Sequence, residues 1–297
     1  MLRWFLRRIK RFVLLLAALL LLLPLALWSM ASTEKGSRWL LNTAIKMLPQ
    51  EITVERIDGA ILDAVTLRGV RFSAAPHSGA IATAHLRWQP AELLQRRLHL
   101  NEITLDGLDL IIGKTEGGGG AVDLAAPPLE IALDSATISD SSVTLEGRRY
   151  AIESVELSAR TLQQRLVVES LRVAAAPLRQ ASLAGEISLS KPYPLEFSLQ
   201  WQAQHVQTGV LKGEGRLRGD FDALDFEHQL LAPLKLSTTA QIIPAENPQI
   251  TLQGEWRQLS WPFVGEAQYH SPRGSFSLSG TPADYQLRLD APLSGPG

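Results

Sequence analysis

The sequence lacks cysteine and has almost no net charge, and both features exclude classes of protein. With no cysteine in its 297 residues, the chain has no disulfide, thiolate metal site or cysteine nucleophile. Its 29 Lys and Arg residues balance 30 Asp and Glu residues, which leaves a formal net charge of -1. The only basic cluster is at the N-terminus, so the basic stripe of a nucleic-acid-binding protein is missing. Stability must come from strand pairing and packing.

Motifs for catalysis and metal binding are also missing. The histidines form no HxxxH or HExxH pattern, and no G-x-S-x-G occurs. Asp106 and Asp109 could be considered as a carboxylate pair, but strand alternation places them on solvent-facing or turn positions. We therefore expect a protein that is not an enzyme, with no catalytic residues, no metal ligands and no cofactor.

An uncharged apolar run from Phe12 to Ala31 is the longest feature of the chain. As a helix it would rise roughly 30 Å, enough to cross the hydrocarbon core of a bilayer. Residues 1–11 contain several basic residues and no acid, so the positive-inside rule keeps this tail in the cytoplasm and sends the rest of the chain across the membrane. The predicted anchor, residues 12–31, is marked by Phe12, Leu16, Leu20, Pro24 and Trp28.

A cleaved signal peptide is the alternative for the same run. Ser29-Met30-Ala31 resembles a small-x-small cleavage site, and the basic start fits a signal sequence. The apolar run is longer than the roughly 7 to 15 residues usual for a signal peptide, which favours a retained anchor. In both cases the remaining chain is exported.

A short amphipathic helix is predicted within residues 32–49. Leu40, Leu41, Ala44, Ile45 and Leu48 follow helical spacing, and a proline ends the run. This helix could lie on the membrane surface or cap the start of a sheet.

From residue 50 onward the apolar period changes from 3.6 to 2, which is typical of half-buried strands. The alternation continues almost to the last residue, with a helix predicted only at residues 90–97, where Pro90 stands in the first turn. The connections are short and carry no helical crossovers, so we predict a mainly β fold with antiparallel meander pairing.

A short motif recurs at intervals of about 40 residues. Its copies, of the form [VI]-T-L-x-G, occupy residues 65–69, 103–107 and 143–147. In each copy the apolar residues change parity after the glycine, as Val65 and Leu67 are followed by Val70 and Phe72. The glycine is therefore either a β-bulge that keeps one face apolar or a turn between two short strands.

The segment of residues 114–128 interrupts the strand pattern. It contains four successive glycines and a Pro pair, which cannot continue a strand ladder. We expect a flexible loop or linker between a first β segment, residues 50–113, and a second, residues 129–297.

The one-sided apolar pattern requires that one face of the sheet be covered. Each buried Leu, Ile or Phe contributes roughly 1.5 to 3 kcal/mol. Two sheets could pack together as a sandwich, or one sheet could form a trough that holds an apolar ligand. Periodicity does not distinguish them, although the sandwich needs no ligand.

A series of motifs follows the predicted anchor and ends before the glycine run: Thr33-Glu-Lys-Gly36, Val54-x-x-Ile57-x-Gly59, Leu67-x-Gly69-Val70, Leu86-Arg-Trp88 and Ile103-x-Leu105-x-Gly107. In this order, the features of residues 1–113 resemble the N-terminal part of the TamB family, which belongs to the AsmA-like, bridge-type lipid-transfer proteins. The resemblance is looser over residues 129–297, where it rests on strand rhythm and Pro192-Tyr193-Pro194-Leu195.

This resemblance implies a long antiparallel sheet curled into an open hydrophobic groove in the periplasm, held by an inner-membrane anchor. It implies phospholipid transport toward the outer membrane and support of outer-membrane protein assembly, with a TamA-like barrel as partner. The family's proteins are longer and end in a C-terminal domain that meets this partner, so we expect the chain to be a piece of a longer protein. The residues expected to line the groove are Val65, Leu67, Val70, Phe72, Leu86, Trp88, Ile103, Leu105, Leu108, Leu110, Val143, Leu145, Leu195, Phe197, Leu199 and Trp201.

Overall fold

The computed structural model describes residues 29–47, 51–113, 124–245 and 247–295. The predicted anchor residues Phe12, Leu16, Leu20, Pro24 and Trp28 lie outside these ranges. Among the described residues, no helix is both long enough and apolar enough to cross a bilayer.

The described chain is mainly β, as the period-2 pattern predicts. The elements in chain order are α2 (Glu34–Met47), β1 (Glu51–Gly59), β2 (Ala64–Ala74), β3 (His77–Trp88), the 3-10 helix η1 (Pro90–Gln95), β4 (Arg97–Ile112), β5 (Glu130–Leu145), β6 (Arg148–Leu162), β7 (Arg165–Ala175), β8 (Leu178–Ser188), β9 (Leu195–His205), β10 (Gly209–Gly219), β11 (Leu224–Ala232), β12 (Lys235–Ile243), β13 (Gln249–Trp261), β14 (Tyr269–Gly280) and β15 (Tyr285–Asp290).

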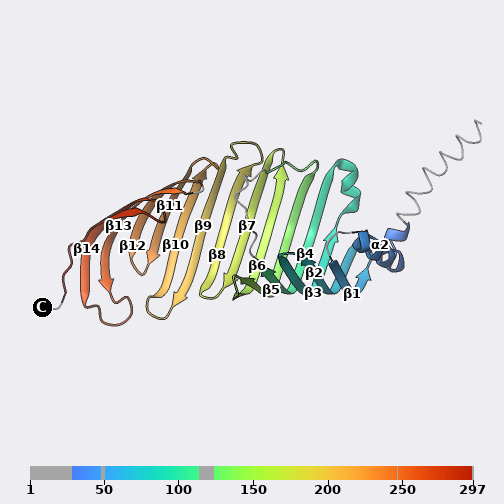
Figure 1. The fold of residues 1–297 in the computed structure, drawn as a ribbon, viewed down its shortest axis with the longest axis horizontal. Helices are drawn as coiled ribbons and strands as arrows, with labels where there is room; N and C mark the ends of the chain where they lie inside the picture. Colours follow the sequence, from blue (N-terminus) through green and yellow to red (C-terminus); the bar gives the residue numbers. More distant parts are fainter. Residues whose placement is uncertain (1–28, 48–50, 114–123, 246, 296–297) are drawn as a thin grey trace, which may run out of the picture.

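All strands belong to one 15-stranded sheet whose spatial order equals the chain order, from β1 beside α2 to β15 near the C-terminus (Figure 1). Every neighbouring pair is antiparallel except β4 and β5, which are parallel. The prediction of a wholly antiparallel meander is therefore wrong at this pair. A parallel pair needs a connection of about a dozen residues or more, and the segment between Ile112 and Glu130 is long enough to return the chain to the starting edge.

The strand register carries one apolar face across the sheet. Directly opposed residues lie on the same face, as do residues two apart in a strand. One row of opposed residues runs through β2, β3 and β4 as Val65, Leu86 and Ile103. It continues through β6 to β9 as Leu157, Leu171, Leu183 and Leu199.

The recurring glycine has two structural roles, and of the alternatives raised by the sequence only the turn occurs. Gly69 and Gly107 have positive φ angles of 62° and 65° and lie where the ladders with β3 lack one residue pair, but the register on either side is unshifted, so neither glycine is a β-bulge. The apolar residues on both sides of each glycine stay on one face because the parity changes at the same level on the neighbouring strands. Asp140 of β5, with φ 46°, lies at the same level. In the third copy, Glu146 and Gly147, both with positive φ, form the tight turn between β5 and β6.

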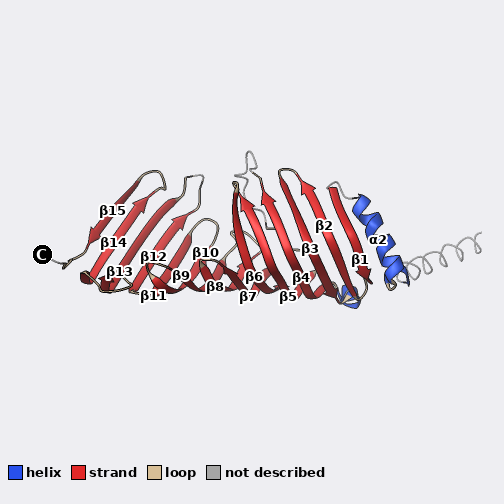
Figure 2. Ribbon diagram, turned by 90° about the horizontal axis from the view of Figure 1, so that it is seen from below, coloured by secondary structure: helices blue, strands red, loops and turns tan. Residues whose placement is uncertain are grey.

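No second sheet covers the apolar face, so the β-sandwich alternative is wrong for the described chain. Only five apolar side chains in these ranges are buried, namely Ile57, Val65, Val70, Tyr193 and Trp256. A dry sandwich core would bury most of an inner face. The strands instead form one open, uncurled layer (Figure 2), which differs from the curled groove that the resemblance implies.

Helix α2 caps the β1 end of the sheet. The Ser37 side chain is fully buried, accepts the Ile61 N–H at 2.9 Å and donates to the Ala31 carbonyl at 2.9 Å. Arg38 Nε donates to the Ile57 carbonyl of β1 at 3.2 Å. Of the two placements left open by the sequence, the capping one is confirmed.

The segment predicted as a helix over residues 90–97 forms the shorter η1, a 3-10 helix. Pro90 starts it, and Arg96, with φ 59°, ends it in a left-handed conformation. Arg97 already belongs to β4.

Candidate functional site on the apolar face of the sheet

All of the predicted groove-lining residues lie on the same face. Val65, Leu67, Val70 and Phe72 of β2 oppose Leu86, Ala84, Ile81 and Gly79 of β3. Leu105 and Leu110 continue these rows into β4, and Leu110 lies beside Val143 of β5. On β9, Leu195, Phe197, Leu199 and Trp201 oppose β8 residues of that face. The structure places these residues together on one surface, and their role as a lipid-binding lining remains a prediction.

These side chains shield one another only in part. Val65 and Val70 are each 8 % exposed, whereas Leu145 at the end of β5 is 47 % exposed. The remaining predicted lining residues are neither buried nor fully exposed and have intermediate exposure. Because a buried apolar side chain is worth a few kcal/mol, such a face gains free energy when an apolar ligand covers it.

Large aromatic rings on this face lie across glycines of the neighbouring strand. Phe72 is paired with Gly79, and a Cβ built on that glycine would lie 2.5 Å from the Phe72 ring. The same arrangement recurs in the pairs Phe197–Gly185, Trp201–Gly213, Trp256–Gly274 and Phe276–Gly254. The rings therefore fill the space above the glycine backbone instead of standing upright from the sheet. The sequence did not lead us to predict this packing of rings over glycines, although glycines at apolar-face positions of strands could have indicated it.

A polar side chain sits within the C-terminal part of the apolar face. His228 of β11 follows Leu199 and Gly215 in the cross-strand row. Trp201 Nε1 donates to His228 Nε2 at 3.0 Å, and the two rings are stacked 5.9 Å apart. Burial lowers the pKa of His228, because the charged imidazolium is poorly solvated there. The neutral imidazole that results accepts the tryptophan bond.

The opposite face is polar and carries cross-strand ion pairs. Arg172 meets Glu156 at 3.3 Å and Arg165 meets Glu186 at 3.1 Å. Across the parallel β4–β5 pair, Asp106 and Asp109 accept hydrogen bonds from Ser139 and Ser142. These two aspartates therefore have structural partners on the polar face.

His99 joins η1 to the β4–β5 pair on the polar face. Its Nδ1 lies 2.9 Å from Glu92 Oε1 of η1, and its Nε2 lies 3.0 Å from Asp134 of β5. The Glu92 bond, and secondarily the Asp134 bond, raise the pKa of His99. Within the described ranges, no group of His and acidic residues has the arrangement needed to hold a metal ion.

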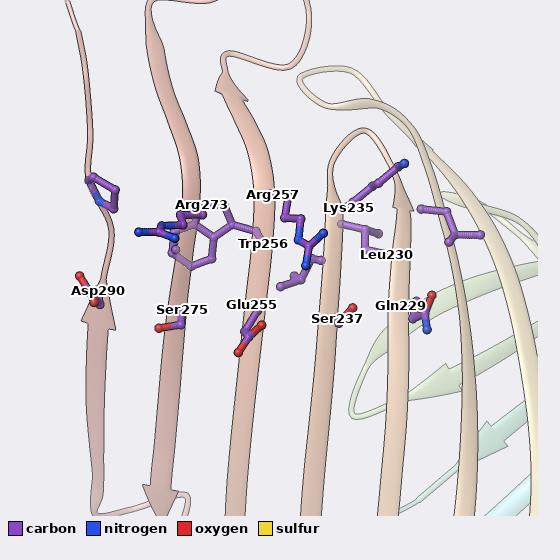
Figure 3. Close-up of a pocket in the computed structure, with 14 residues that line it drawn as sticks. Gln229, Leu230, Lys235, Ser237, Glu255, Trp256, Arg257, Arg273, Ser275 and Asp290 are labelled. Atoms are coloured by element: carbon purple, nitrogen blue, oxygen red, sulfur yellow. The ribbon is translucent and has the colours of Figure 1, made fainter.

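A hollow on the described surface does not coincide with the predicted lining. It has a volume of about 780 Å³ and lies over β11 to β15 (Figure 3). Most of the side chains around it, including Lys235, Glu255 and Arg273, belong to the polar face by strand alternation. A hollow lined in this way suits a polar group, whereas the apolar face suits hydrocarbon.

A family model described as TamB, N-terminal domain, matches residues 21–118 and 122–297. The chain belongs to the TamB family. No curated protein and no solved structure matches the chain. The TamB match continues on both sides of the glycine run, so the strands before and after it belong to one family domain. This agrees with the direct pairing of β4 with β5 in a single sheet.

Proposed function

We propose that this TamB-family chain is a non-enzymatic carrier surface for phospholipid, anchored in the inner membrane and extending into the periplasm. The observation that supports the proposal is the apolar face that continues across the 15 strands with no second layer over it. Large apolar faces exposed to water are rare in folded proteins and usually mark a site that an apolar partner covers. Acyl chains have the required chemistry, since their contact with the face removes apolar surface from water on both sides.

In the proposed mechanism the sheet curls around the acyl chains and forms a groove. Aliphatic rows such as Val65, Leu86 and Ile103 would contact the chains. Rings that lie across glycines would not project from the face, so that an acyl chain could slide over them without steric hindrance. Headgroups would stay at the open side in water. The direction of transport would depend on partners at the two membranes.

The proposed topology places residues 1–11 in the cytoplasm and the sheet in the periplasm. It rests on the basic N-terminal tail and the uncharged run of residues 12–31. We further propose that transport and support of outer-membrane protein assembly require an outer-membrane TamA-like barrel, reached through a region beyond this domain. A reporter active only in the periplasm, fused after Pro49, tests the topology, and activity of a cytoplasmic reporter at the same position would contradict it.

A second function, binding of unfolded outer-membrane strands, is favoured by β15. All of its residues are exposed, with Leu287 at 59 % and Leu289 at 66 %. An unpaired edge with an apolar face accepts another strand through backbone hydrogen bonds. This function uses the end of the sheet and is compatible with lipid on its face.

Site-specific photocrosslinking in cells tests the lipid proposal. A photoreactive residue replaces Leu199, on the apolar face, or Ser198, its neighbour on the polar face of the same strand. The matched pair differs only in the face presented. We expect phospholipid adducts at position 199 and few at 198. Equal labelling at both positions, or no lipid at either, would exclude the apolar face as the lipid path.

A further inference from the structure

Three cationic side chains oppose one another on adjacent strands of the polar face. Lys235 of β12 is the cross-strand partner of Arg257 of β13, which is the partner of Arg273 of β14. Within the described chain none of the three makes an ion pair. Like charges directly opposite in a sheet are destabilising. This cation row therefore costs stability, and no carboxylate of the described chain lies within ion-pair distance of it.

Elsewhere on the same face, arginines oppose acids. Arg218 meets Glu196 at 3.1 Å, and Arg71 meets Glu55 at 3.2 Å. A solvated polar face would be expected to continue this pattern through β12 to β14. The cation row departs from this pattern at the hollow over β11 to β15.

A second row of polar side chains runs beside the cation row. Ser237, Glu255, Ser275 and Asp290 are successive cross-strand partners, and the first three lie two residues along their strands from the cations. That spacing corresponds to about 7 Å. Figure 3 shows the two rows along the hollow, the basic side chains above and the serines and acids below. The hollow therefore offers positive charge on one side and hydroxyl and negative groups on the other.

The cation row lies at a notch in one rim of the sheet. The short turn between β11 and β12 lies level with Lys212 of β10 and Arg257 of β13, because Ala232 pairs with Lys212 and Lys235 with Arg257. The neighbouring strands continue past this level, β10 to Gly209 and β13 to Trp261. At this notch a group on the polar face is separated from the apolar face only by the short β11–β12 turn.

We propose that this hollow binds the phosphoethanolamine headgroup of a phospholipid. Lys235, Arg257 and Arg273 bind the phosphodiester, because guanidinium and ammonium groups form charge-assisted bonds with its oxygens. Glu255 and Asp290 bind the ammonium group, which sits on the neighbouring row. The notch lets the chains of the bound lipid turn onto the apolar face near Trp256. This last step rests on the proposed lipid-carrying function, whereas headgroup binding stands without it.

The site is tested with water-soluble headgroups, which have no acyl chains. The full-length chain in phospholipid-free detergent is titrated with glycerophosphoethanolamine, glycerophosphoglycerol or inorganic phosphate, and binding is followed by phosphorus NMR. K235Q/R257Q/R273Q should weaken all three at least tenfold. E255Q/D290N should weaken only glycerophosphoethanolamine, to the affinity of glycerophosphoglycerol. The control R165Q/R172Q/R218Q, which removes three paired arginines from the same face, should leave the binding of all three ligands unchanged.

Each outcome bears on a different part of the proposal. Absence of wild-type binding, or equal binding by K235Q/R257Q/R273Q, overturns the site. If phosphate binds as tightly as glycerophosphoethanolamine and E255Q/D290N has no effect, the hollow is a plain anion site and the phosphoethanolamine assignment is wrong. Removing opposed like charges should not lower the thermal midpoint, so lost binding cannot be attributed to unfolding. A failed lipid crosslink at Leu199 with intact headgroup binding would contradict only the proposed lipid path.

Discussion

The N-terminal and C-terminal parts of the sheet use different residues to build the same apolar face. From β2 to β8, the central row consists of aliphatic residues, among them Val65, Ile103 and Leu171. From β10 to β13, the same row contains Gly215, His228, Thr238 and Gly254. The first part covers its backbone with many aliphatic side chains and the second with fewer, larger rings. A continuous apolar surface therefore does not require an apolar residue at every position, because one ring can cover the neighbouring glycine.

The polar faces of the two parts differ as well. Ion pairs join neighbouring strands through the first part, as in Arg172–Glu156. Over β12 to β14, unpaired cations line a hollow. The first part therefore has the features of a structural scaffold with an aliphatic face. The second part has the features of a binding site for a charged group.

The largest predicted effect separates the buried start of the apolar face from its exposed end. Val65→Asp buries a charge without a partner and should lower the free energy of unfolding by roughly 3 kcal/mol. Leu289→Asp, at a side chain that is 66 % exposed, should change it by less than about 0.5 kcal/mol. Chemical denaturation of both variants measures the difference. Equal losses would mean that the two ends of the face are equally covered.

The next effect tests whether rings replace aliphatic cover in the C-terminal part. Gly254→Ala places a methyl group where the Phe276 ring lies, and should cost roughly 1 to 2 kcal/mol through overpacking. In a Phe276→Leu background the same change should cost much less, because the ring is gone. A double-mutant cycle measures this coupling. A coupling near zero would show that ring and glycine act independently.

A smaller effect concerns two histidines that should respond to pH in opposite directions. The pKa of His99 is raised by its bonds to Glu92 and Asp134. Its contribution to the free energy of unfolding is therefore complete below about pH 6.5 and is lost as pH rises through the folded-state pKa. The pKa of His228 is lowered by burial. Its contribution to the free energy of unfolding is therefore complete above about pH 6.5 and is lost as pH falls toward the folded-state pKa. Unfolding of His99→Gln and His228→Gln across pH 5 to 8 should show opposite changes of slope. Parallel slopes would contradict one of the two assignments.

The smallest effect on stability, but a clear one on association, is expected at the sheet edges. The β1 end is capped by α2, whereas every residue of β15 is exposed. Leu287→Lys should reduce self-association of the full-length chain in detergent at micromolar concentration and leave its unfolding unchanged. Sedimentation velocity measures the association state. A wild-type monomer whose Leu287→Lys variant unfolds would place β15 inside a paired sheet.

The sequence by itself determined the β class, the single apolar face and the change of parity at the recurring glycine. These features follow from local rules, since alternation of period 2 and the parity change after Gly69 are legible along the chain. The predicted lining residues lie on one surface for the same reason.

Only the tertiary structure decided how the strands assemble. The parallel β4–β5 pair depends on where the chain returns after residue 113, and the choice of one open layer over a sandwich depends on contacts between distant segments. The rings over glycines, the His99 contacts and the cation row depend on which residues of neighbouring strands face each other. Register and pairing are relations between segments, set by the free energy of the whole sheet, and no single stretch of sequence contains them.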